Sequence, residues 1–255
     1  MFKKKLLIIT GAGQGIGKHI AENVTKEYEL LLISKSNNCK KVAEKINLKN
    51  KREKKAMYIK INFEKKINLK LLLSKLNYKK YSEIHLVLCA GVVDYNFKSY
   101  LKRSDWIKVF QVNLFSQIQL INFFINLVKK KKYNKKIIYF SGGGAANSFK
   151  EFPIYSASKT ALVRTVENYA EIYKKKNINI FAVAPGTIRT KMSEKVRKIA
   201  KIKPTSKLSD VSKFINFCLK INTHTFSGRL INIKDNFKNI KKNKDSNFLK
   251  IRRVE

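Results

Sequence analysis

A tyrosine and a lysine four residues apart, in Tyr155-Ser-Ala-Ser-Lys159, are the side chains best suited to chemistry. Residues at i and i+4 share one face of a helix, so the ammonium of Lys159 can lie beside the phenol of Tyr155. A nearby positive charge favours the phenolate and lowers the pKa of a tyrosine from about 10. Tyr155 could then give a proton to a carbonyl oxygen or take one from an alcohol. Such a pair also arises by chance in a lysine-rich chain, so its place in the fold decides its meaning.

A glycine-rich turn near the amino terminus is suited to binding the phosphates of a nucleotide. The stretch Thr10-Gly-Ala-Gly-Gln-Gly-Ile-Gly17 separates an apolar run from an amphipathic one. Its glycines allow a tight turn, close approach of the backbone to a pyrophosphate, and close packing of a helix on a strand. The free N–H groups at the start of that helix favour an anion. A purely structural turn is the alternative, but a position between strand and helix favours nucleotide binding.

Short apolar runs alternate with longer amphipathic segments along the whole chain. The expected strands are Leu6–Thr10, Leu30–Ser34, Ala56–Asn62, Ile84–Cys89, Lys136–Ser141, Ile178–Ala184 and Arg229–Ile233. The expected helices are Ile16–Lys26, Cys39–Asn50, Ile67–Leu76, Ser104–Lys132, Ile154–Lys176 and Asp210–Leu219. Most strands are continuously apolar, as parallel strands covered on both faces require.

This alternation predicts one α/β domain over residues 1–235, a doubly wound Rossmann-type fold with a predominantly parallel sheet of about seven strands. Residues 236–255 form a basic tail that we expect to be partly disordered. The charged segment Lys191–Lys207 follows an expected strand and is expected to be a loop. Ligands of such sheets bind beyond the carboxyl ends of the strands, where this loop would cover them.

The formal net charge of +39 raises the question of an anionic partner such as nucleic acid. The basic residues are mostly lysines spread along the chain, whereas arginine, which suits bidentate phosphate and base contacts, is scarce. We therefore expect no dedicated nucleic-acid binding. A basic nucleic-acid-associated protein remains an alternative, and binding that survives moderate salt would identify it.

The cysteines and histidines predict no metal site. Three cysteines (Cys39, Cys89, Cys218) and three histidines (His19, His85, His224) are widely separated and form no ligand pair. The odd cysteine count fits a reduced, intracellular protein. The apolar stretch that follows the first lysines is too short for a signal peptide, and no run is long enough to span a membrane. A cytoplasmic location is therefore expected.

The glycine turn resembles the T-G-x-x-x-G-I-G motif of the short-chain dehydrogenases/reductases, and every fixed position matches. Together with the Tyr155-x-x-x-Lys159 pair, the resemblance extends over nearly the whole chain. It implies reversible hydride transfer between a nicotinamide cofactor and a small carbonyl or alcohol substrate. Tyr155 would be the acid/base, and Lys159 would tune it and bond the nicotinamide ribose. The resemblance also implies a homo-oligomer, a dimer or tetramer formed through the helices at 104–132 and 154–176.

The resemblance further implies which residues bind the cofactor. At the first turn these are Gly11, Gln14, Gly15, Ile16 and Gly17. In Leu88-Cys-Ala-Gly91, which resembles the family's N-N-A-G segment, only Ala90 and Gly91 carry over, and Asn62 stands where the family has an Asp near the adenine. Further along, the P-G stretch supplies Pro185, Gly186, Ile188 and Thr190, the last two for the nicotinamide carboxamide.

The end of the second expected strand bears on the choice between NADP(H) and NAD(H). It has no acidic residue to bond a ribose 2′-hydroxyl, and Lys35 stands where NADP-preferring members often carry Arg. We therefore expect NADP(H) to be preferred to NAD(H). Alternatively, Lys35 is one more surface lysine, and several-fold tighter binding of NADH would support that view.

Two further catalytic positions follow from the resemblance. Asn113 lies in the stretch that resembles the family's helix carrying an Asn, which anchors a water leading protons toward the lysine. The family's serine most often precedes the tyrosine by thirteen residues, a position that holds Gly142 here, whereas Ser141 precedes it by fourteen. Either the glycine run lets Ser141 orient the substrate, or the hydroxyl is missing and Ser148 is a weaker substitute.

A subgroup of the family has a similar S-G-G-G-A stretch, so we assign the serine role to Ser141. The rival hypothesis is a catalytically impaired nucleotide-binding sensor or scaffold. The missing serine favours that rival, and the presence of Tyr155, Lys159 and Asn113 argues against it. The segment expected to select the substrate carries no motif that identifies a substrate.

Overall fold

Seven parallel strands form one sheet at the centre of the computed structural model, which describes residues 4–50, 55–74, 76–94, 102–221 and 224–235. The expected tail, 236–255, lies outside these residues. The strand order is β3-β2-β1-β4-β5-β6-β7, and every neighbouring pair is parallel. The strands are β1 (Lys4–Thr10), β2 (Tyr28–Ser34), β3 (Ala56–Lys60), β4 (Tyr81–Leu88), β5 (Lys135–Phe140), β6 (Ile178–Ala184) and β7 (Leu230–Asn232).

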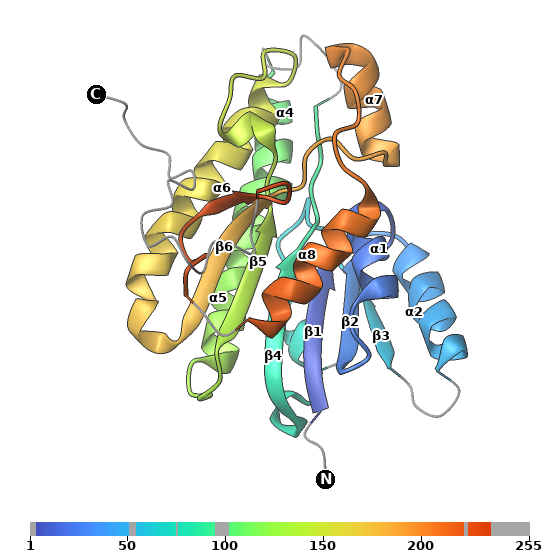
Figure 1. The fold of residues 1–255 in the computed structure, drawn as a ribbon, viewed down its shortest axis with the longest axis vertical. Helices are drawn as coiled ribbons and strands as arrows, with labels where there is room; N and C mark the ends of the chain where they lie inside the picture. The colour runs from blue at the N-terminus through green and yellow to red at the C-terminus, as the bar shows by residue number, and fades with distance from the viewer. Residues whose placement is uncertain (1–3, 51–54, 75, 95–101, 222–223, 236–255) are drawn as a thin grey trace.

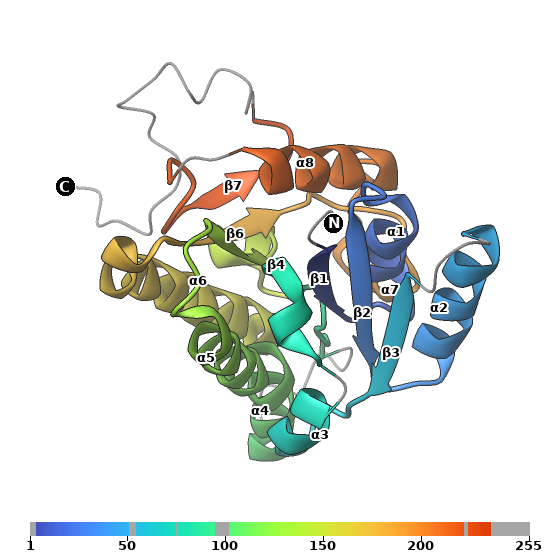
Figure 2. The ribbon, with the colours of Figure 1, turned by 90° about the horizontal axis from the view of Figure 1, so that it is seen from below.

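Helices cover both faces of the sheet, so the expected doubly wound α/β fold is confirmed. Figure 2 shows α1 (Gly15–Asn23), α2 (Asn38–Lys49) and α8 (Leu208–Lys220) on one face, and α4 (Arg103–Phe110), α5 (Ser116–Val128) and α6 (Pro153–Ile172) on the other. Alternate residues of β1 enter the two cores: Leu6 and Ile8 pack on the side of α5 and α6, and Leu7 and Ile9 on the side of α1 and α8. Continuous apolar strands are thus explained by burial on both faces.

The expected long helix at 104–132 is not one regular helix. It consists of α4, a π-helical turn η3 (Gln111–Phe115) and α5, which ends at Val128. In the wide turn the N–H of Ser116 bonds the carbonyl of Gln111, five residues earlier. Single π turns of this kind are frequent at functional sites. Here the turn contains Asn113, so the departure from the expected helix lies at a predicted catalytic residue.

The expected loop at 191–207 is wrong over most of its length, because residues Lys191–Ala200 form helix α7. Thr190 caps this helix: its hydroxyl accepts a hydrogen bond from the N–H of Ser193, and its own N–H bonds the Ser193 hydroxyl. Reciprocal caps of this kind stabilise helix N-termini. The helix ends where Lys201 adopts a left-handed conformation with φ of 50°, as is common at helix C-termini. Figure 1 shows α7 beyond the carboxyl ends of the strands, where the segment was expected to cover a site.

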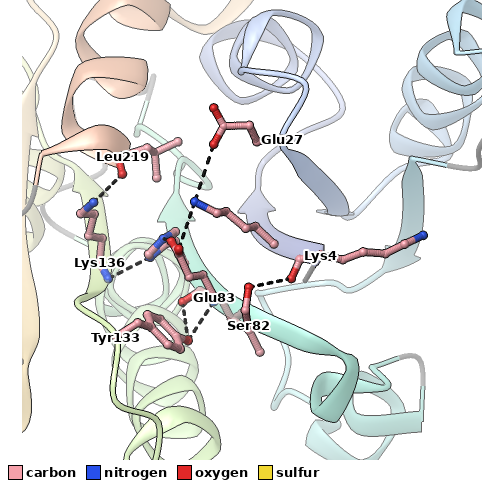
Figure 3. Close-up of polar contacts among 10 residues, drawn as sticks. Lys4, Glu27, Ser82, Glu83, Tyr133, Lys136 and Leu219 are labelled. Atoms are coloured by element: carbon pink, nitrogen blue, oxygen red, sulfur yellow. Dashed lines mark hydrogen bonds and ion pairs between the residues drawn. The ribbon is translucent and has the colours of Figure 1, made fainter. Parts of the chain in front are cut away.

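A buried polar cluster lies toward the opposite, amino-terminal ends of β4 and β5 (Figure 3). The side-chain ammonium of Lys136 donates to the backbone carbonyl of Leu219, near the end of α8, and the backbone N–H of Lys136 donates to Nδ1 of His85. The other ring nitrogen of His85 lies 3.3 Å from a carboxylate oxygen of Glu83, which also pairs with Lys5 at 3.0 Å. With Nδ1 accepting, Nε2 carries the proton of a neutral imidazole. Burial lowers the pKa of His85 and lowers that of Lys136 to about 8.

The residues that the structure describes contain neither a membrane-spanning helix nor a cluster of metal-binding side chains. No helix in these ranges is long and apolar enough to cross a membrane. Within the same ranges, no three His, Cys, Asp or Glu side chains gather where they could hold a metal ion. The cysteines Cys39, Cys89 and Cys218 are all free thiols.

Candidate active site

The turn between β1 and α1 has a shape that only glycine permits. Gly11 has a φ of +66°, and a Cβ there would lie 2.8 Å from the backbone nitrogen of Ala90. A Cβ on Gly17 would lie 2.6 Å from the carbonyl oxygen of Gly11. The turn therefore packs directly on the end of β4 and on its own helix, as the spacing of the glycines predicts.

A cavity of about 620 Å³ lies in front of this turn and fits a dinucleotide. It is lined by ten of the predicted cofactor-binding residues, namely Gly11, Gln14, Gly15, Ile16, Gly17, Lys35, Asn62, Ala90, Gly91 and Thr190. The first turn of α1 has no acidic residue, and Gln14 at its N-cap makes no side-chain capping bond. The amides at this helix end can therefore bind phosphate oxygens.

Lys35 lines the cavity but is already paired. Its ammonium lies 2.9 Å from a carboxylate oxygen of Glu64, which lines the same cavity. The hydrogen bond from Lys35 lowers the pKa of Glu64. Glu64 follows Asn62, whose side-chain oxygen accepts the N–H of Glu64. The sequence did not predict this acid, which lies in the turn after β3, whereas Lys35 lies directly after β2.

A second cavity of about 230 Å³ adjoins the first, and Ile16, Cys89, Gly91, Thr190 and Met192 line both. It brings together the predicted catalytic residues Ser141, Tyr155 and Lys159 with the predicted cofactor residues Pro185, Gly186 and Ile188. Helix α7 contributes Met192, Ser193 and Val196 to its wall. Residues from four separate parts of the chain therefore meet at the carboxyl ends of the strands.

Lys159 is buried and points its ammonium at two acceptors. Its Nζ donates to the hydroxyl of Tyr139 at 2.6 Å and to the backbone carbonyl of Phe140 at 2.9 Å. It also lies 5.6 Å from the ring centroid of Tyr155, one turn earlier in α6. Burial lowers the pKa of Lys159 to about 7. The lysine can therefore change its charge near neutral pH, which few surface lysines do.

Asn113 does not line either cavity but lies directly behind them, fully buried. Its side-chain oxygen accepts from the N–H of Val92 at 2.8 Å, and its amide donates to the carbonyl of Val92 at 2.9 Å and to Ser158 at 3.0 Å. Asn113 is therefore a buried and fully bonded residue, and not an exposed or helix-capping asparagine. It ties the segment after β4 to the helix that carries Tyr155 and Lys159.

The first turn of α6 is anchored by a residue that the sequence did not single out. The N–H of Tyr155 donates to a carboxylate oxygen of Asp94 at 3.2 Å, and Asp94 is buried. A carboxylate near the start of a helix stabilises its exposed N–H groups and its positive dipole end. Pro153 occupies the first position of the helix, where a missing N–H costs nothing. No sequence motif marked Asp94, because its partner is a backbone group 61 residues away.

Gly142, not Ser141, faces the phenol of Tyr155. A Cβ on Gly142 would lie 3.1 Å from the Tyr155 hydroxyl oxygen. Ser141 is buried, lines the smaller cavity, and its hydroxyl has no hydrogen-bond partner within the described structure. Buried polar groups are nearly always bonded, so a buried hydroxyl without a partner at this position is unusual.

Thr190 also has a role that its sequence position did not suggest. Its hydroxyl oxygen accepts the N–H of Ser193 and so caps α7. A hydroxyl keeps one donor and a second lone pair after accepting one bond, so it can still contact a ligand. Because Thr190 lines both cavities, the start of α7 is fixed at the place where they meet.

Comparison with known proteins places the chain in a family. Residues 5–201 match the model of the short chain dehydrogenase family. Dehydrogenase/reductase SDR family member 4 of Caenorhabditis elegans is 31% identical over 76% of this chain and 74% of its own length. The 3-oxoacyl-[acyl-carrier-protein] reductase FabG of Buchnera aphidicola subsp. Schizaphis graminum is 27% identical over 81% of this chain and 82% of its own.

Solved structures share the fold. ElxO with NADP bound superimposes with a TM-score of 0.74 at 21% identity, over 90% of this chain and 97% of ElxO. A 4-hydroxyisoleucine dehydrogenase complexed with NADH gives a TM-score of 0.74 at 20% identity, over 90% of this chain and 96% of that one. The match to the family model covers the glycine turn, Asn113, Tyr155 and Lys159. The chain therefore belongs to the short chain dehydrogenase family and is an NAD(P)-dependent oxidoreductase.

Proposed function

We propose that the protein transfers hydride reversibly between NADP(H) and a small carbonyl or alcohol substrate, with Tyr155 as the acid/base. The convergence of Tyr155 and Lys159 on a cavity that adjoins the dinucleotide-sized cavity carries the proposal. When bound, the nicotinamide cofactor supplies or accepts the hydride. The chain itself must hold the cofactor, orient the substrate and move one proton.

Proton transfer is assigned to the phenol of Tyr155. In the direction of reduction Tyr155 gives its proton to the substrate oxygen, and in oxidation it takes the proton from the alcohol. The Lys159 ammonium stabilises the phenolate that reduction leaves behind. Asn113 holds the two elements together behind the site, through Val92 and Ser158. Ser141 orients the substrate oxygen, since its buried hydroxyl has no other partner in the described structure.

The preference for NADP(H) over NAD(H) rests on Lys35 and on the absence of an acid at the end of β2. Lys35, Ser34 and Ser36 line the cavity. The Lys35 ammonium and the Ser36 hydroxyl can donate to a phosphate, whereas the Ser34 hydroxyl already donates to the carbonyl of Ser36. Glu64 opposes this preference because it neutralises Lys35. Structural relatives have been solved with either NADP or NADH, so the relatives do not decide between the two cofactors.

The names of the relatives favour a carbonyl as the substrate that is turned over. Three are 3-oxoacyl-[acyl-carrier-protein] reductases, and another is a benzil reductase from Bacillus cereus. We propose screening ketones of several sizes, including 3-oxoacyl thioesters and aromatic diketones.

Assembly, location and domain count stay predictions. A homo-oligomer formed through the segment α4-η3-α5 and through α6 is supported by exposed apolar side chains on these elements: Ile107 is 54% exposed, Phe115 54% and Ile172 62%. The free thiols fit the expected cytoplasmic location. A single domain over 1–235 and the S-G-G-G-A subgroup are untested expectations.

Fluorescence titration with NADPH and NADH at moderate salt tests the proposal, with ADP-ribose as the control for simple charge attraction. We expect saturable binding of both cofactors, with NADPH the tighter, followed by turnover on the carbonyl panel that Tyr155→Phe abolishes. Ordered cofactor binding without turnover on any carbonyl would favour the sensor or scaffold. That alternative draws on one observation, that glycine stands where the family's serine would face Tyr155.

A further inference from the structure

Tyr139, on β5, is a buried tyrosine that neither the sequence nor the family resemblance singles out. Its side chain is fully buried, and its hydroxyl contacts two predicted catalytic residues at once. The hydroxyl accepts a hydrogen bond from Nζ of Lys159 at 2.6 Å and donates one to the backbone carbonyl of Asn113 at 3.4 Å. A phenol carries one donor and one or more acceptor sites, so both bonds can form together in these directions.

The π turn η3 explains why the carbonyl of Asn113 can accept a side-chain donor. A wide turn takes carbonyls out of the regular i→i+4 pattern of the flanking helices. Two consecutive backbone carbonyls of this turn accept hydrogen bonds from side chains. The side-chain amide of Gln117 donates to the carbonyl of Val112 at 2.8 Å, and the Tyr139 hydroxyl donates to that of Asn113. The phenol of Tyr139 therefore completes the hydrogen bonding of the turn on its buried side.

The surroundings of Lys159 depend on the same phenol. Its ammonium has two described acceptors, the Tyr139 hydroxyl and the Phe140 carbonyl, and both belong to β5. The ammonium also lies 4.7 Å from the ring centroid of Tyr139, a distance at which a cation is attracted by an aromatic face. Burial strongly raises the pKa of Tyr139, so the phenol stays protonated and serves as a neutral dipole.

We propose that Tyr139 is a positioning residue of the active site: its hydroxyl bridges the Lys159 ammonium and the Asn113 carbonyl and keeps Lys159 charged. Without this acceptor only the Phe140 carbonyl would oppose the cost of burying the ammonium. The inference rests on the proposed role of Lys159, but it makes a claim about the lysine that can be measured without any substrate.

The test is an NMR titration of protein labelled with 13C at the lysine ε carbon. The ordinary pKa of a lysine is about 10.4, whereas Lys159 and Lys136 are expected to titrate near 7 and near 8. Lys159→Met and Lys136→Met identify the two signals by removing them. In Tyr139→Phe we expect the Lys159 midpoint to fall by about one pH unit, the size expected for one lost hydrogen bond to a charged group.

Two controls separate this effect from general loosening. The Lys136 midpoint should stay unchanged in Tyr139→Phe. The matched variant Tyr133→Phe removes another largely buried phenol, bonded to Ile84 and not to Lys159, and should leave the Lys159 midpoint unchanged. An unchanged Lys159 midpoint in folded Tyr139→Phe would overturn the proposal.

A measurement on the wild-type protein covers the case in which Tyr139→Phe does not fold. With 13C at the tyrosine ζ carbon, the Tyr139 resonance should show an inflection at the pH at which Lys159 titrates, and no inflection would overturn the proposal. If a carbonyl substrate is found, the pH profile of kcat should move in Tyr139→Phe as the Lys159 midpoint does, and not in Tyr133→Phe. Failure to find a substrate leaves the NMR result intact, so the two hypotheses fail separately.

Discussion

Glu64 should weaken the preference for NADPH, and Glu64→Gln should strengthen it. The Lys35 ammonium and the Glu64 carboxylate lie 2.9 Å apart at the wall of the dinucleotide cavity. A 2′-phosphate bound by Lys35 must replace this ion pair and must also approach a second negative charge. The neutral glutamine keeps the length and shape of the side chain while it removes both costs.

The size of the effect follows from the exposure of the pair. Lys35 is 60% exposed and Glu64 33%, so the pair belongs with surface ion pairs, which contribute about 0.2–1 kcal/mol. Releasing Lys35 should therefore tighten NADPH binding by up to about fivefold, since about 1.4 kcal/mol corresponds to tenfold. NADH lacks the phosphate and should change by less than about twofold on the same reasoning. The gain should shrink as salt is raised, because exposed charges are screened over about 8 Å at physiological ionic strength.

Fluorescence titrations of wild type, Glu64→Gln, Lys35→Met and the double variant measure this coupling. In the Lys35→Met background the glutamine should bring a smaller gain, because the ion pair it would release no longer exists. Equal tightening of NADPH and NADH by Glu64→Gln would refute the reasoning, since it would show that the acid does not act on the phosphate. Tighter binding of NADH than NADPH by the wild type would remove the proposed preference itself.

Three further predictions concern catalysis and stability. Tyr155→Phe should lower kcat by about 10²–10⁴-fold, the usual contribution of a general acid, while NADPH affinity in the same titration stays within about twofold. Ser141→Ala should lower kcat by about tenfold or more. Adding Gly142→Ser should restore part of the lost kcat, because a Cβ at 142 faces the Tyr155 hydroxyl. Wild-type turnover in Ser141→Ala would contradict the assigned role. Lys136 has a pKa lowered to about 8 in the folded protein, against about 10.5 when unfolded, so the free energy of unfolding should rise with pH between these two values. The melting temperature of wild type relative to Lys136→Met should therefore rise over that interval. A constant difference between the two melting temperatures would contradict this assignment.

The sheet and the pair Tyr155–Lys159 could be predicted because their signals are local. A strand buried on both faces must be apolar throughout, and β1, β2 and β6 show this in consecutive residues. A glycine whose φ is positive, as at Gly11, likewise carries its reason in its own residue type.

Helix α7 was missed although its signals were present in the sequence. The Thr190 cap and the apolar residues Met192, Val196 and Ile199 have helical spacing. Each apolar residue directly follows a lysine, so the segment as a whole looked like a charged loop. None of its residues is buried, because the helix lies over the site rather than in the core.

Other features could not be predicted because they depend on residues that meet only in the fold. Tyr139 has the appearance of an ordinary core residue of β5, and its contact with Lys159 joins positions twenty residues apart. The pairing of Lys35 with Glu64 joins the segments that follow two different strands, β2 and β3. Which of Ser141 and Gly142 faces Tyr155 depends on the turn after β5, and sequence spacing alone left this open.

The π turn at Gln111–Phe115 determines how α4 is rotated about the helix axis relative to α5. In a regular helix each residue advances the chain by about 100°, so removal of one residue from the wide turn would convert η3 into ordinary helix and rotate α4 by about that angle relative to α5. The face that α4 presents to α6 would turn away, while the helix as such would gain regular bonds. Such a deletion should therefore leave the helix content unchanged but disrupt the active site.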